Sequence, residues 1–318
     1  MIALDAHSGT ITTLVFCTDA MIHGSIVALV TPMTTAGALD FAALKRLVLF
    51  HIQEKTDAIV IVGTTGESPV VDMNEHRQLI EKCVEYADKK IPVIAGTGAN
   101  STAEAIELSR FAKSAGANAA LSVVPYYNKP GQEGIYRHFA AIAEQADIDM
   151  ILYNVPGRTV ADMSNDTTLK LAEIPNIIGI KDATGDIARA SHLVEEVRTL
   201  ERPFALYSGD DMTALASLFL GFDGVISVTA NVAPHLMHKM CAAMRTGHFD
   251  KAREINFSLA GLHRNLFVET SPGPVKWAVA ELGLTEYGIR LPLTKLGEDG
   301  QQKVAAAMRQ AGIKKEKT

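Results

Sequence analysis

Eight short runs of apolar residues, rich in valine, isoleucine, leucine and alanine, recur along the chain. The runs are continuous rather than alternating, which is typical of strands that are buried on both faces of a parallel sheet. We expect these strands at residues 25–30, 57–62, 91–95, 118–124, 149–153, 176–180, 204–207 and 223–228. Helical periodicity fills the gaps, for example at 41–54, 74–87, 102–115 and 133–145, with Asp40, Asn74 and Ser101 as expected N-caps.

The repeat length is mostly about thirty residues, as expected for a unit of one strand and one helix. Eight consecutive units of this kind favour a closed (β/α)8 barrel, the TIM-barrel fold, over an open doubly wound sheet. The pattern changes after residue 247, where 250–262, 274–282 and 300–311 read as helices with no strand between them. We therefore predict an α/β catalytic barrel at 21–247 and a small C-terminal helical domain at 248–318. Residues 1–20 are treated as an extension of unknown structure, with Met21 as an alternative start.

Composition narrows the classes of function. The chain has 318 residues, is 47% hydrophobic and carries a net charge of −6 without a basic stripe, which argues against a nucleic-acid partner. It has no apolar stretch approaching the ~20 residues of a membrane span, and no Lys or Arg precedes Lys45, so a secretory n-region is missing. Cys17, Cys83 and Cys241 match neither a disulfide framework nor a zinc site, and such cysteine usage favours a cytoplasmic location.

All eight predicted strands end in polar or glycine-rich residues, and Lys181 is one of them. The segments that follow the strands are 31–32, 63–67, 96–98, 125–128, 153–158, 181–182, 208–211 and 227–229. In such barrels the chemistry lies at the carboxyl ends of the strands, so these segments would meet in one pocket. Lys181 could be a lysine that snorkels to water, or an amine nucleophile whose neutral form a semi-enclosed site favours. The polar ring around it favours the nucleophile.

Each of the other strand-end residues could have either a role in the chemistry or a purely structural role. The Gly63–Gly66 turn could offer backbone N–H groups to a carboxylate, or could be a plain turn that uses glycine for its positive φ angles. Tyr153 could pass protons to and from Lys181, or be a rim tyrosine. Arg158 has the fork that suits a carboxylate, but a solvated loop arginine is the default. Asp210 and Asp211 are expected to cap the following helix rather than bind a metal, because no histidine or third carboxylate lies close by in sequence.

Four motifs carry a family resemblance: Gly-Thr-Thr-Gly-Glu at 63–67, Tyr-Asn-Val-Pro at 153–156, Gly-Ile-Lys at 179–181 and Ser-Gly-Asp-Asp at 208–211. Together they resemble the N-acetylneuraminate lyase superfamily of class I aldolases, and from about Gly24 onward the chain resembles its dihydrodipicolinate synthase family. The resemblance implies a lyase that condenses pyruvate with L-aspartate 4-semialdehyde in diaminopimelate and lysine biosynthesis, without a metal or other cofactor, and usually as a homotetramer.

The resemblance also implies roles for individual residues. Lys181 would form the Schiff base, and Thr64, Tyr153 and Tyr127 of a neighbouring subunit would form a proton relay. Thr65 would hold the pyruvate carboxylate through its backbone, Arg158 would bind the semialdehyde carboxylate, and the Ile226 carbonyl would lie near the lysine. An allosteric lysine site would comprise Ser68, His76, Asn100, Glu104 and Tyr126. Met73 and Pro69 depart from the pattern of that site, so weak to moderate inhibition by lysine is expected.

Two alternatives are weighed against this function. The first is another pyruvate-dependent aldolase of the same superfamily, which would act on a sugar acid. Arg158 disfavours it, because this arginine suits a small acidic aldehyde. The second is a barrel that has lost catalysis and serves as a binding protein. It is disfavoured because Lys181, Tyr153 and Arg158 are all present.

Overall fold

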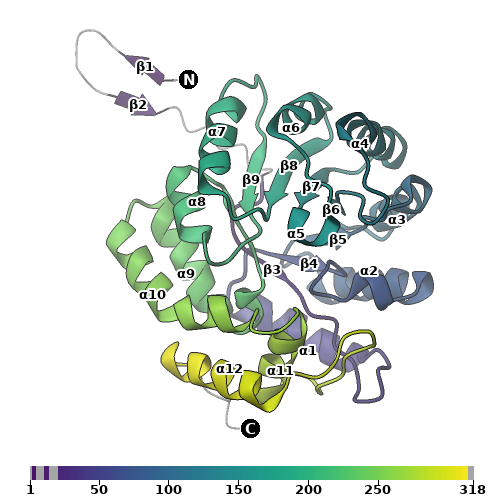
Figure 1. Cartoon of the computed structure of the whole chain (residues 1–318), viewed down its shortest axis with the longest axis vertical. Coiled ribbons are helices and arrows are strands. Elements are labelled where there is room, and N and C mark those ends of the chain that lie inside the picture. Colours follow the sequence, from purple (N-terminus) through teal and green to yellow (C-terminus); the bar gives the residue numbers. More distant parts are fainter. Residues whose placement is uncertain (1, 5–10, 14–20, 314–318) are drawn as a thin grey trace.

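The structure is a computed structural model that describes residues 2–4, 11–13 and 21–313. Eight parallel strands close into a barrel in the order β10-β3-β4-β5-β6-β7-β8-β9, with helices around it (Figure 1). The strands are β3 (Gly24–Ala28), β4 (Ala58–Ile61), β5 (Val93–Gly96), β6 (Ala119–Val123), β7 (Met150–Asn154), β8 (Ile177–Asp182), β9 (Ala205–Ser208) and β10 (Gly224–Ser227). The predicted (β/α)8 barrel and its eight strands are confirmed.

Burial on both faces explains why the strand sequences are continuously apolar. In β3, Ile26 and Ala28 point into a barrel interior of apolar side chains, whereas Val27 packs outward beneath the helices. In β4, Val60 points inward and Ile59 outward in the same way. Because successive side chains of a strand point to opposite faces, neither face has room for a charged residue until the strand ends.

The helices of the barrel follow their strands. They are α1 (Phe41–Gln53), α2 (Met73–Ala87), α3 (Thr102–Ser114), α4 (Gln132–Ala146), the short α5 (Pro156–Thr159), α6 (Asn165–Ala172), α7 (Ile187–Val197), α8 (Ala214–Leu220) and α9 (Pro234–Arg245), with 3-10 turns η1 (Ser68–Val70) and η2 (Thr229–Asn231). The predicted caps Asp40 and Ser101 are confirmed.

The predicted N-cap Asn74 is wrong, because the cap of α2 is Asp72. The Asp72 carboxylate accepts hydrogen bonds from the N–H groups of Asn74 at 2.8 Å and Glu75 at 2.9 Å. The Glu75 carboxylate in turn accepts one from the N–H of Asp72 at 3.2 Å. This reciprocal capping box satisfies more N–H groups than a cap at Asn74 could, so the helix begins earlier than predicted.

After the barrel come α10 (Phe249–Asn265), α11 (Gly273–Glu281) and α12 (Glu298–Gln310), the three helices expected there. Helix α10 packs against α9 and α12, and α11 and α12 lie beside α1 at one side of the barrel (Figure 1). The division into domains at residue 247 stays a prediction. Of the predicted extension 1–20, the structure describes only β1 (Ile2–Leu4) and β2 (Ile11–Thr13), which pair antiparallel; Cys17 lies outside the described residues. No helix in the described part of the chain could cross a membrane.

Candidate active site

Lys181 and Tyr153 meet at the carboxyl end of the barrel. They occupy paired positions on the neighbouring strands β8 and β7, and their side chains are both buried. The amine nitrogen of Lys181 lies 4.2 Å from the centroid of the Tyr153 ring. The two side chains thus lie together, and the part of the Tyr153 hydroxyl in proton transfer stays a prediction.

The amine of Lys181 has no anionic partner to hold it. Among the described residues, no carboxylate oxygen lies within 4.0 Å of it and it donates no hydrogen bond, although the side chain is only 6% exposed. The other buried lysine, Lys276, is instead paired with the carboxylate of Glu67. An amine that no ion pair holds is available to act as a nucleophile.

Gly209, in the loop after β9, positions the end of β8 in two ways. The N–H of Gly209 donates to the carbonyl of Asp182 at 2.6 Å, one residue beyond Lys181. A Cβ atom at Gly209 would lie 2.8 Å from the Cε atom of Lys181, so glycine leaves space for the lysine stem. The motif containing Gly209 was recognised from the sequence, but this role was not, because it depends on the approach of two neighbouring strands.

The Gly63–Gly66 turn has free N–H groups. The Gly63 carbonyl accepts hydrogen bonds from the N–H groups of Gly66 at 3.0 Å and Ser68 at 3.3 Å. Among the described residues, the N–H groups of Thr64 and Thr65 donate to no acceptor of the protein. Thr65 is buried and Thr64 half-buried. This arrangement fits the expected carboxylate site.

The glycines of this turn serve packing rather than positive φ. The left-handed residues are Val62, with φ of 53°, and Glu67, with φ of 59°. A Cβ atom at Gly66 would lie 3.0 Å from the Cα of Val62 and 3.2 Å from the carbonyl oxygen of Leu29, so the turn lies close against the strand ends. The interpretation as a plain turn with glycines at positive φ is thus wrong.

Arg158 lies in α5 and is exposed, with one guanidinium nitrogen 3.3 Å from the carbonyl oxygen of Ser271. The loop after α5 is fastened to the end of β7 by Asn154, whose side-chain amide donates to Asp162 at 2.7 Å and accepts from the N–H of Met163 at 3.0 Å. The role of Arg158 in binding a carboxylate stays a prediction.

Arg189 of α7 joins the end of β8 to the loop after α5. Its guanidinium contacts Asp162 at 3.0 Å and Asp182 at 3.3 Å. The second contact holds the residue next to Lys181. Nothing in the sequence pattern marks Arg189, because its partners lie on two other segments of the chain.

Two predicted residues are placed without a contact to the lysine. Tyr127 follows β6 and is 88% exposed, with a left-handed φ of 72°. Ile226 lies in β10 with its side chain in the barrel interior. The roles of Tyr127 and of the Ile226 carbonyl stay predictions.

The five residues of the expected lysine site are Ser68, His76, Asn100, Glu104 and Tyr126. The pKa of Tyr126 is raised by burial and, to a smaller extent, by the Glu104 carboxylate. A hydrogen bond with the backbone of Asn100 opposes this increase, so Tyr126, Glu104 and Asn100 are neighbours. His76 is buried, and its Nε2 atom lies 2.7 Å from the Gly96 carbonyl oxygen, which ends the strand before Asn100. Burial lowers the pKa of His76.

The aspartates after β9 have separate structural roles. Asp210 caps the turn just before α8, since its carboxylate accepts from the N–H of Thr213 at 3.0 Å and from its hydroxyl at 2.7 Å. Neither aspartate caps α8 itself, contrary to the prediction, because the N-cap of that helix is Thr213 and no side chain caps it. Asp211 instead contacts the end of β10. Its carboxylate accepts from the N–H groups of Val228 at 3.0 Å and Thr229 at 2.9 Å, which fastens the loop after β10. Within the described residues, no group of histidines, cysteines or carboxylates could hold a metal ion.

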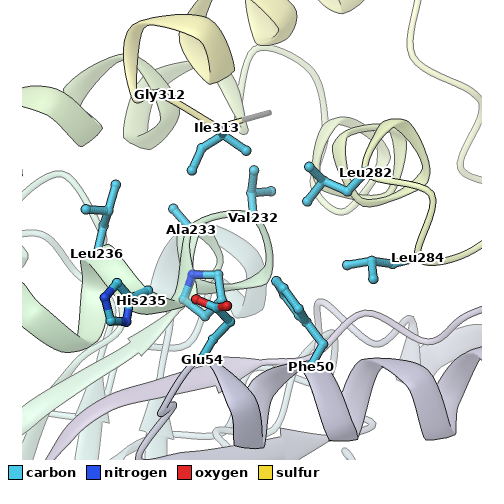
Figure 2. Close-up of a pocket in the computed structure, with 11 residues that line it drawn as sticks. Phe50, Glu54, Val232, Ala233, His235, Leu236, Leu282, Leu284, Gly312 and Ile313 are labelled. Carbon is cyan, nitrogen blue, oxygen red and sulfur yellow. The ribbon is translucent and has the colours of Figure 1, made fainter. Parts of the chain in front are cut away.

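A separate pocket of about 180 Å³ lies between the ends of α1, α11 and α12 and the start of α9 (Figure 2). Apolar side chains such as Phe50, Leu236 and Leu282 line most of it, with Glu54 and His235 at one side. It contains none of the predicted site residues, so the chemistry is assigned to the barrel mouth.

The fold and this site define a (β/α)8-barrel enzyme that carries a buried, unpaired lysine amine at the catalytic end of its strands. Residues 21–311 match the dihydrodipicolinate synthetase family. The chain belongs to this family.

Individual relatives cover nearly the whole chain. The 4-hydroxy-tetrahydrodipicolinate synthase of Dechloromonas aromatica is 64% identical over 92% of this chain and 99% of its own. The dihydrodipicolinate synthase of Acinetobacter baumannii, solved in complex with pyruvate, is 53% identical with a TM-score of 0.90, over 92% of this chain and all of its own. The enzyme of Cyanidioschyzon merolae, solved with lysine bound, is 39% identical with a TM-score of 0.88, over 92% of this chain and 99% of its own.

Proposed function

We propose that this protein is a lyase that condenses pyruvate with L-aspartate 4-semialdehyde to 4-hydroxy-tetrahydrodipicolinate, in diaminopimelate and lysine biosynthesis, with Lys181 as the Schiff-base lysine. The observation that carries the assignment of the nucleophile is the buried amine of Lys181, which lies over the Tyr153 ring and has no counter-charge among the described residues. The activity is that of relatives up to 64% identical over nearly their whole length.

Pyruvate would bind with its carboxylate at the free N–H groups of Thr64 and Thr65. The Lys181 amine attacks the keto carbon, and loss of water gives an imine. Loss of a methyl proton then gives an enamine, the carbon nucleophile of the reaction. The hydroxyl of Tyr153 passes these protons, with Thr64 and Tyr127 of the partner subunit completing the relay.

The enamine carbon attacks the aldehyde carbon of the semialdehyde and forms the new carbon–carbon bond. Arg158 holds the semialdehyde carboxylate, to which its planar fork is suited. The amino group of the bound semialdehyde then attacks the imine carbon, closes the ring and displaces the lysine, which returns the enzyme to its starting state. The Ile226 carbonyl lies near the lysine in this proposal.

Assembly as a homotetramer is part of the proposal, because the relay needs Tyr127 of the partner subunit. Tyr127 is 88% exposed, as a residue that completes a neighbouring site would be in an isolated chain. A second apolar surface is formed by Phe219 of α8 and by Phe249 and Phe257 of α10, helices that lie side by side (Figure 1). Two self-complementary surfaces are what a tetramer built from dimers requires. Sedimentation of a Phe257→Glu variant should then show dimers instead of tetramers.

L-Lysine is proposed as a feedback inhibitor that binds at Ser68, His76, Asn100, Glu104 and Tyr126. Glu104 could pair with its α-amino group, and Tyr126 lies next to Glu104. Initial rates in millimolar lysine should fall by a modest factor, and Glu104→Gln should weaken the inhibition. Unchanged rates would rule out the site.

The cytoplasm is the proposed location. Cys83 and Cys241 are free and buried, and burial raises the pKa of the Cys83 thiol to about 12. Such thiols suit a reducing compartment.

Borohydride reduction in the presence of pyruvate, followed by peptide mass mapping, tests the mechanism. The expected result is one pyruvyl adduct, on Lys181. An adduct on another residue, or none, would overturn the assignment. Product analysis with pyruvate and either the semialdehyde or a sugar-acid aldehyde identifies the second substrate.

A further inference from the structure

Glu67 ends the turn that carries Thr64 and Thr65, and it is held in an unusual way. Its backbone is left-handed, with φ of 59° and ψ of 33°, a conformation that is unfavourable for a residue other than glycine. Its side chain is nevertheless fully buried. One carboxylate oxygen is paired with the amine of Lys276, and the other accepts from the N–H of Arg290 at 3.1 Å.

Lys276 is the buried cation of this pair and comes from α11, after the barrel. Its side chain is completely buried, and desolvation lowers the pKa of Lys276 while the Glu67 carboxylate opposes the decrease. Replacing a buried ion pair by apolar residues is often neutral or stabilising, whereas removing one partner is strongly destabilising. Stability alone therefore gives little reason to place a charge pair here, and a role in geometry explains it better.

The pair is connected to the substrate-binding turn through the backbone. The N–H of Glu67 donates to the carbonyl of Thr64 at 3.1 Å, so a shift of Glu67 is passed directly to the turn. The segment before α11 also reaches the mouth of the barrel, since the Ser271 carbonyl accepts from Arg158 at 3.3 Å. The chain after the barrel thus contacts Arg158 directly and, through Glu67, is connected to the turn that carries Thr64 and Thr65.

We propose that the Glu67–Lys276 pair is a positioning device, which holds the 63–67 turn in the shape that presents the N–H groups of Thr64 and Thr65 to the carboxylate of pyruvate. Neither Glu67 nor Lys276 contacts the substrate. The inference rests on the proposed binding of pyruvate at this turn. It gives the C-terminal helices a part in substrate binding in addition to any part in folding.

Steady-state kinetics of Glu67→Gln, Lys276→Met and the double variant, with both substrates varied, test the proposal. Each single variant should raise the KM for pyruvate at least tenfold and leave the KM for the semialdehyde within twofold. The double variant leaves no unpaired buried charge. It should therefore regain much of the Tm lost in the single variants, while its KM for pyruvate stays raised.

Glu75→Gln is the matched control. It breaks the ion pair between Glu75 and Arg290, whose closest atoms are 2.5 Å apart and which also joins α2 to the chain after the barrel. It leaves the Glu67 carboxylate in place, so the Tm should fall while the KM for pyruvate stays within twofold of the unaltered enzyme.

The outcomes separate the two proposals. If the variants fold and their KM for pyruvate is unchanged, the pair is merely structural and the inference is overturned. If the single variants do not fold, the KM of the double variant alone decides this. If the unaltered enzyme yields no pyruvyl adduct on Lys181, the proposed function fails instead. A KM for pyruvate that rises equally in Glu75→Gln would also overturn the inference.

Discussion

Gly209 leaves the space that the side chain of Lys181 occupies. A Cβ atom on Gly209 would lie 2.8 Å from the Cε atom of Lys181 and 2.7 Å from the Cβ atom of Ala183, which is closer than side chains can approach. Its φ angle is not in the left-handed region, so backbone freedom does not explain this glycine. The proximity of β8 and β9 at their carboxyl ends makes glycine necessary if the lysine stem is to stand over Tyr153.

Gly209→Ala should therefore damage catalysis more than folding. The added methyl group displaces the lysine stem, and a displacement of about 1 Å at a reacting atom can cost a factor of about 100 in rate. We expect kcat/KM for pyruvate and the rate of borohydride trapping to fall together by about 10- to 100-fold. Overpacking should lower the stability by about 1–3 kcal/mol. Gly131→Ala is the control, because a Cβ atom there meets nothing within 4 Å and the rates should not change.

Tyr153→Phe should separate imine formation from proton transfer. The phenyl ring can still lie under the amine, but the hydroxyl that passes protons is lost. Because a positioned acid or base typically contributes a factor of about 10²–10⁴, kcat should fall by that order. Mass spectrometry should still find the reduced pyruvyl adduct on Lys181. A kcat within threefold of the unaltered enzyme would remove Tyr153 from the relay.

Arg158→Lys should impair one substrate and not the other. Lysine keeps the positive charge but lacks the planar fork for a carboxylate. We expect the KM for the semialdehyde to rise about tenfold, equivalent to about 1.4 kcal/mol, and the KM for pyruvate to stay within twofold. Arg137→Lys, at another exposed arginine, should change neither value. An increase confined to pyruvate would mean that Arg158 binds the other carboxylate.

Much of this arrangement could be predicted because it is local in sequence. The continuous apolar runs indicate strands buried on both faces, and the residue types after each run indicate the mouth of the barrel. That information placed Lys181 beside Tyr153 and located the Gly63–Gly66 turn.

What could not be predicted depends on contacts between distant segments. Glu67 and Lys276 are 209 positions apart, and no spacing rule joins them. The role of Arg189 could not be predicted either, because its carboxylate partners lie at the end of β8 and in the loop after α5. The cap at Asp72 is a different case: its partner Glu75 is three residues away, so the capping-box spacing was available and was missed.

His51 provides a test of the core through pH. It is fully buried in α1, with its Nδ1 atom 2.8 Å from the Thr56 hydroxyl, and desolvation lowers its pKa to about 3. In the unfolded chain a histidine has a pKa of about 6.5. Between these values the unfolded state binds the proton and the folded state does not, so stability is complete above about pH 6.5 and decreases as the pH falls toward 3.

The His51→Asn variant should be less stable at pH 7 but lose less on acidification, because asparagine can keep the hydrogen bond to Thr56 and does not titrate. Between pH 6.5 and 4.5 the unaltered protein should lose about 2.3 kcal/mol more free energy of unfolding than the variant, because the slope rises from half of about 1.36 kcal/mol per pH unit at pH 6.5 to that full value at lower pH. Denaturant unfolding at a series of pH values measures this difference directly. His138, whose pKa burial lowers to about 4, titrates in both proteins and cancels. A curve for His51→Asn that runs parallel to that of the unaltered protein would contradict this prediction, because it would show that His51 is protonated in the folded state as readily as in the unfolded state.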